Sequence, residues 1–99
     1  MIRYNAMFEK KGDIRYISHL DLMTVLRRAI RRSGLPFVTT AGFTPRVKIS
    51  IPMALKLGKE SVDEQMSFWL MEKVELDKAV KAINNNLPKG VKILKVNGS

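Results

Sequence analysis

Apolar and polar residues alternate from Ile2 to Glu9, a period of two that is typical of a half-buried strand. The same alternation returns from Glu64 to Glu72. Shorter apolar runs predict three further strands, at 37–40, 46–51 and 91–96. These segments are expected to form one sheet.

A helical period predicts a first helix that begins after Ser18 and ends at Gly34. Ser18 suits an N-cap, and Asp21 at the third helical position completes a capping-box-like pair. The expected inner face carries Leu22, Val25, Leu26, Ala29 and Ile30. The opposite face carries Arg27, Arg28, Arg31 and Arg32.

A second helix is predicted from an Asp77 cap to Pro88-Lys89-Gly90, which ends it. Its expected inner face carries Leu76, Ala79, Val80, Ile83 and Leu87. Four connections complete the chain: a turn at 11–13, an extended run at 14–17, a turn at 41–45, and a loop at 52–61 that contains Leu57 and Gly58.

The element order strand–helix–strand–strand–helix–strand is the split βαβ pattern of a ferredoxin-like α+β fold. It predicts an antiparallel sheet with both helices on one face. The length of 99 residues suits a single domain over 1–99.

The charge distribution adds a candidate function. Residues 1–59 contain 12 Lys and Arg and three acids, and residues 60–99 contain six of each, so the net charge of +9 comes entirely from the first part. Clustered cations bind polyanions such as RNA through counterion release. The alternative is a solvated basic surface without a ligand.

Candidate RNA-binding residues gather in this basic part of the chain. A helix selected only for solubility would alternate acids with its arginines, because like charges one turn apart repel one another. The predicted RNA-binding residues are Arg27, Arg28, Arg31, Arg32, Arg46, Lys48, Lys10 and Lys11.

Several classes of function are disfavoured. The chain has no cysteine and one histidine, so a thiolate or histidine-rich metal site is excluded, and no cofactor is expected. It lacks a glycine-rich phosphate loop and clustered acids, so an enzyme acting alone is not expected. No membrane span or signal peptide is expected, and the cytoplasm is the simplest location.

Many short segments of the sequence, taken in their order along the chain, resemble the radical SAM-linked protein family. This family is a bacterial domain of unknown function found alone or at the end of B12-binding-type radical SAM proteins. The segments are Phe8–Met23, Leu26–Ala29, Arg31–Pro36, Gly42–Pro45, Lys48–Ser50, Leu57-Gly58, Ser61 and Glu64. The family domain is longer than this chain, which resembles its N-terminal half. Ser67 departs from the pattern by standing where an acid is expected, which weakens a carboxylate pair with Glu64.

The resemblance implies a context of RNA processing or modification, with a radical SAM protein or a ribonuclease of the G/E type as partner. It carries over no catalytic residue. Any radical chemistry would belong to the partner.

Ser18 and His19 form a separate anion-binding candidate, since free amides at a helix N-terminus favour anions and Lys10 and Lys11 lie in the preceding turn. A structural role for His19 is the alternative, because no nucleophile or ligand partner is evident. A nuclease or transferase centred on His19 is the least favoured reading.

Met7, Trp69 and Met71 are expected on the sheet face away from the helices. An exposed apolar patch usually marks a protein contact. The cover could be the second half of the family domain, a fused enzyme or a second copy of the chain. A docking or dimerisation domain is therefore the alternative to an RNA-facing module.

Overall fold

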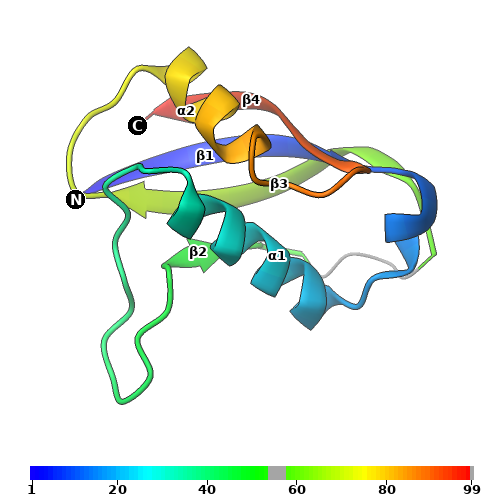
Figure 1. Ribbon diagram of the computed structural model, residues 1–99, viewed down its shortest axis with the longest axis horizontal. Coiled ribbons are helices and arrows are strands. Elements are labelled where there is room, and N and C mark those ends of the chain that lie inside the picture. The colour runs from blue at the N-terminus through cyan, green and yellow to red at the C-terminus, as the bar shows by residue number, and fades with distance from the viewer. Residues whose placement is uncertain (54–57, 99) are drawn as a thin grey trace.

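The computed structural model describes residues 1–53 and 58–98, so Leu57 of the predicted loop lies outside them. Figure 1 shows two helices over one face of an antiparallel sheet. The sheet contains β1 (Ile2–Lys10), β2 (Ile49–Ser50), β3 (Ser61–Leu70) and β4 (Val91–Gly98), in the spatial order β2-β3-β1-β4. The predicted ferredoxin-like α+β architecture is confirmed.

The core lies between the sheet and the two helices, α1 (His19–Arg32) and α2 (Leu76–Asn84). Alternation along β1 buries Tyr4, Ala6 and Phe8 on the helix side. The Tyr4 ring stacks on Phe68 of β3 at a centroid distance of 5.4 Å, and the Tyr4 hydroxyl accepts a hydrogen bond from the Val74 amide. Tyr4 therefore joins the central strands to the start of α2.

Helix α1 follows its predicted pattern closely. Ser18 is the N-cap, and its hydroxyl accepts a hydrogen bond from the Asp21 amide at 3.1 Å. The helix ends at Arg32, Ser33 is its C-cap residue, and Gly34 follows with a φ of +81°. Four residues of the predicted inner face are buried, and the fifth, Val25, is partly buried at its flank; the buried four are Leu22, Leu26, Ala29 and Ile30.

Four local predictions are wrong. Residues Gly12–Tyr16, predicted as a turn and an extended run, form a 3-10 helix. Glu75, not Asp77, is the N-cap residue of α2, and Asp77 lies in the first turn. The helix ends at Asn84, earlier than predicted, and Leu76 is exposed instead of buried.

Two hydrogen bonds to β4 are made where α2 ends. The Asn84 side chain donates to the Ile93 carbonyl at 3.0 Å and accepts from the Ile93 amide at 2.7 Å. This pair satisfies both backbone groups of a residue on the edge strand β4. The helix terminus is thus tied to the sheet by a contact that periodicity does not reveal.

The segment predicted as two short strands is mostly irregular. It contains β2 and two isolated bridges, Phe37 to Leu70 and Thr39 to Val47. Figure 1 shows the connection between α1 and β2 extending away from the sheet. Val47 is nonetheless buried in the core. Its burial fixes residues 45–48, the returning limb of this connection, beside the body of the protein.

The 3-10 helix is held against the turn before β4. The Lys11 amide donates to the Gly90 carbonyl at 2.8 Å, and Gly90 has a φ of +97°. A Cβ atom on Gly90 would lie 2.6 Å from Cγ2 of Ile14 and would also meet the Lys11 carbonyl oxygen. Only glycine fits this contact.

We therefore expect Gly90→Ala to lower the free energy of unfolding by about 3 kcal/mol, since backbone strain and overpacking act together. Gly34→Ala is the matched control, because Gly34 has a positive φ but no neighbouring atom within 4 Å. It should cost only about 1 kcal/mol from the backbone term. Urea unfolding measures both, and equal losses would contradict the packed arrangement at Gly90.

Candidate nucleic-acid interface

A cleft of about 330 Å³ lies between α1 and the returning limb of the connection to β2. Four of the lining side chains are arginines, three from α1 and one from the returning limb. The lining residues are Thr24, Arg27, Arg28, Arg31, Pro45, Arg46 and Val47. We call this the arginine cleft.

The geometry of α1 places its three arginines here. Leu22 and Leu26 point into the core, so Arg28 and Arg31 must point away from it at 100° per residue. Arg31 is further positioned by Phe37, whose ring centroid lies 5.4 Å from the guanidinium carbon. A guanidinium over an aromatic face is held in a restricted orientation.

Arg46 comes from a different part of the chain. Its carbonyl accepts a hydrogen bond from the Thr40 amide at 2.7 Å, and its own amide donates to the Thr40 hydroxyl at 3.1 Å. Burial of the neighbouring Val47 holds this limb close to α1. The backbone thus positions Arg46 and leaves its side chain to line the cleft.

The charged side chains that the structure describes around the arginine cleft are all positive. Within residues 1–53 and 58–98, none of its four guanidiniums forms an ion pair with a carboxylate. Burial lowers the pKa of Arg27, and the positive charge of Arg46 lowers it further. The Arg27 Nε is buried and has no hydrogen-bond partner among the described residues. The cleft therefore brings four positive charges together, and the Nε–H of Arg27 donates no hydrogen bond to the described residues.

The other predicted RNA-binding residues lie elsewhere. Arg32 is exposed and is not among the described lining residues. Lys48 packs on Trp69, with its Nζ 4.7 Å from the ring centroid. Lys10, predicted as a surface contact, is only 1% exposed because its side chain faces the helix side of β1, so it is not available to a polyanion.

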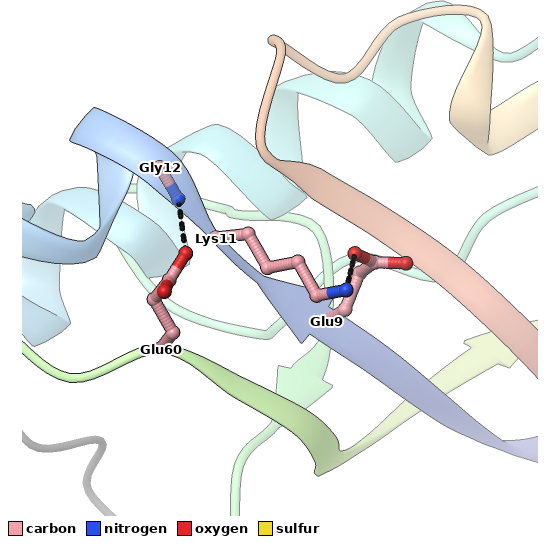
Figure 2. Close-up of polar contacts among 4 residues, drawn as sticks. All are labelled: Glu9, Lys11, Gly12 and Glu60. Carbon is pink, nitrogen blue, oxygen red and sulfur yellow. Dashed lines mark hydrogen bonds and ion pairs between the residues drawn. The ribbon is translucent and has the colours of Figure 1, made fainter.

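Lys11 is partly neutralised. Figure 2 shows its Nζ folded back towards Glu9, at 3.5 Å from Oε2, while Glu60 accepts a hydrogen bond from the Gly12 amide at 2.8 Å. Two carboxylates therefore surround this turn. It lacks the unopposed positive charge of the arginine cleft.

The Ser18 and His19 anion site stays a prediction. The Ser18 hydroxyl is already engaged as the helix cap. Nδ1 of His19 is buried and lacks a hydrogen-bond partner among the described residues. Among all the residues that the structure describes, no three His, Cys, Asp or Glu side chains lie together as a possible metal site.

Trp69 lies on the sheet face away from the helices, since its neighbours Phe68 and Leu70 are buried in the core. Its ring is partly covered by Arg3 and Lys48. Beside it, the buried Ser67 accepts hydrogen bonds from Arg3 and donates one to Asn5 at 2.8 Å. This face is more polar and more cationic than the sequence pattern indicated.

Thr24, Pro45 and Val47 are lining residues that sequence reasoning missed. The helical period could have identified Thr24, which precedes Arg27, Arg28 and Arg31 by three, four and seven residues. Pro45 and Val47 could not have been found this way, because they reach the cleft through the path of the loop.

The fold is a small α+β domain, and the arginine cleft lies between α1 and the connection to β2. The chain belongs to a family of uncharacterized proteins conserved in bacteria (DUF2344), whose model matches residues 3–98. A search of curated proteins finds no match. No helix among the described residues has the length and apolar character needed to cross a membrane.

Crowding of the cleft has a measurable consequence for stability. We expect Arg46→Gln to raise the free energy of unfolding by about 0.3 kcal/mol at low salt, because it removes repulsion with Arg27 in a partly solvated site. The gain should vanish at high salt. Urea unfolding at two salt concentrations measures it.

Arg32→Gln is the control, since it removes the same charge outside the described cleft lining. Arg32 stands in the last turn of α1, where a cation is favoured by the helix dipole, so its loss should be neutral or slightly destabilising. An equal gain from both variants would mean that general charge, not the cleft, sets the effect.

Proposed function

We propose that this chain is a non-catalytic module that faces RNA and presents it to a radical SAM protein or a ribonuclease during RNA processing or modification. The observation that carries the proposal is the arginine cleft, where four guanidiniums converge without a carboxylate among the described lining residues. Such a module works in the cytoplasm, the compartment that holds bacterial RNA.

Phosphate is the ligand class that suits this site best. Guanidinium groups present planar forks of N–H donors that match phosphate oxygens, and they are weakly hydrated compared with ammonium groups. Repulsion among the cleft arginines is relieved when an anion binds. RNA offers such anions at regular spacing, together with ribose and base surfaces that suit Pro45.

The link to radical SAM or ribonuclease chemistry rests on the resemblance of segments such as Phe8–Met23 and Gly42–Pro45 to the radical SAM-linked family. The chain's own residues supply binding and orientation in this proposal. The reaction itself belongs to the partner.

The alternative is a protein-docking or dimerisation domain that uses the open sheet face. Met71 favours it, since 65% of this side chain is exposed just beyond β3. The cations over Trp69 and the polar network at Ser67 argue against an apolar partner for the rest of this face. We therefore prefer the RNA-facing module.

Affinity for single-stranded RNA should fall steeply with salt. Each phosphate contact contributes about 0.7 to the slope of log K against log salt, so Arg28→Gln with Arg46→Gln should reduce the slope by about 1.4. Fluorescence anisotropy with a labelled RNA at several salt concentrations measures the slope.

The matched control is Lys78→Gln with Lys81→Gln, which removes the same charge from the exposed side of α2. If this control reduces the slope as much as the cleft variant, binding is not located in the arginine cleft. If the chain binds no RNA and instead self-associates through Trp69 in sedimentation experiments, the docking alternative replaces the proposal.

A further inference from the structure

The arginine cleft is more selective than a basic surface, because its four guanidiniums line one concavity. Three of them come from two successive turns of α1: Arg27 and Arg28 are adjacent, and Arg31 lies one turn later. The fourth, Arg46, approaches from the returning limb of the connection to β2. A phosphodiester within a chain has two free oxygens and a continuing strand on both sides. A terminal phosphate has three free oxygens and one attachment, so donors can approach it from several directions.

Charge favours the same ligand. Near neutral pH a terminal phosphate monoester carries a charge between −1.5 and −2, because its second pKa is about 6, whereas a diester carries −1. The described lining residues carry four positive groups and no acid. A dianion therefore neutralises this cleft better than a single diester does.

The unused donor of Arg27 supports a ligand that enters the cleft. Its Nε is buried, and no acceptor for it exists among the described residues. A buried N–H group without a partner is costly. Because this atom has almost no surface open to solvent, a phosphate oxygen would supply the missing acceptor only if the Arg27 side chain turned outward into the cleft. Solvated surface arginines would have no such deficit.

The remaining lining suits a nucleotide attached to the phosphate. Pro45 offers apolar atoms beside the arginines, and Phe43 is fully exposed on the same connection. An exposed aromatic ring can stack on a base of single-stranded RNA. A free inorganic anion would leave these groups unused.

We infer that the arginine cleft binds the terminal phosphate monoester of a single-stranded RNA, at the 5′ or the 3′ end. This inference rests on the proposed RNA-facing function and gives it a substrate class, namely RNA ends that carry a phosphate. Arg27, Arg28, Arg31 and Arg46 hold the phosphate, and the adjacent connection contacts the first nucleotide.

The test compares three unlabelled RNAs of identical sequence as competitors against one labelled RNA with hydroxyl ends. One competitor has hydroxyl groups at both ends, one carries a 5′ phosphate and one a 3′ phosphate. One phosphorylated form should compete roughly tenfold better than the hydroxyl form, as expected for an added charge-assisted hydrogen bond. The form that gains identifies the end that is bound.

Arg27→Gln should abolish the advantage of the phosphorylated RNA, and it should also weaken binding of the hydroxyl form, because one cationic contact is lost. Arg27→Lys keeps the charge but loses the planar fork, so it should retain only part of the advantage. The Lys78→Gln control should retain all of it. Circular dichroism of each variant checks that α1 and the sheet are intact.

The pH dependence gives a second readout. The charged groups that line the described cleft are Arg27, Arg28, Arg31 and Arg46, and guanidiniums stay protonated near neutral pH. The advantage should therefore grow between pH 5 and pH 7.5 as the phosphate itself loses its second proton, at about pH 6.

The outcomes distinguish the terminal-phosphate inference from the proposed RNA-facing function. Equal competition by all three RNAs overturns the terminal-phosphate inference and leaves the RNA-facing module standing. Absence of RNA binding in every form overturns both. A terminal advantage that survives both Arg27→Gln and the double variant Arg28→Gln with Arg46→Gln places the phosphate outside the cleft and overturns the inference.

Discussion

The packing of α1 against the sheet is the constraint from which the candidate site follows. Leu22, Leu26, Ala29 and Ile30 must be buried together, because hydrophobic burial is the main favourable term in forming this core. A helix with one buried stripe has no freedom in the direction of its other residues. The arginines at 27, 28 and 31 are consequently directed to the outer side, where acids would ordinarily neutralise them and the described lining residues include none.

The connection between α1 and β2 converts this outer face into a concave site. Its returning limb is anchored by Val47 in the core and by the pairing of Ile49 with Phe68. Anchoring at two points brings Arg46 close to Arg27. Burial lowers the pKa of Arg27, and the positive charge of Arg46 lowers it further. Natural proteins commonly accept such a local loss of stability where a site binds a ligand. The cleft is in this sense an arrangement that core packing imposes and a bound anion would relieve.

The sequence predicted the fold well where local patterns decide it, as in the period-two strand β1 and the capped helix α1. It failed where distant contacts decide. The 3-10 helix Gly12–Tyr16 depends on the turn at Gly90, and the end of α2 is bonded to β4 through Asn84 and Ile93. The candidate site divides in the same way: helical periodicity identified three of the cleft arginines, whereas the proximity of Arg46 and the burial of Lys10 required the tertiary structure.

Binding of RNA in the arginine cleft can be followed by nuclear magnetic resonance of the arginine Nε–H groups during titration with single-stranded RNA, because this method reports each guanidinium separately. If RNA binds in the arginine cleft, the signals of Arg27, Arg28, Arg31 and Arg46 will shift together as RNA is added. The signal of Arg15, which is already bonded to the Gly12 carbonyl and the Tyr16 hydroxyl, should stay in place. Shifts confined to Arg3 and the Trp69 indole, with the cleft signals unchanged, would contradict the account and place the ligand on the open sheet face.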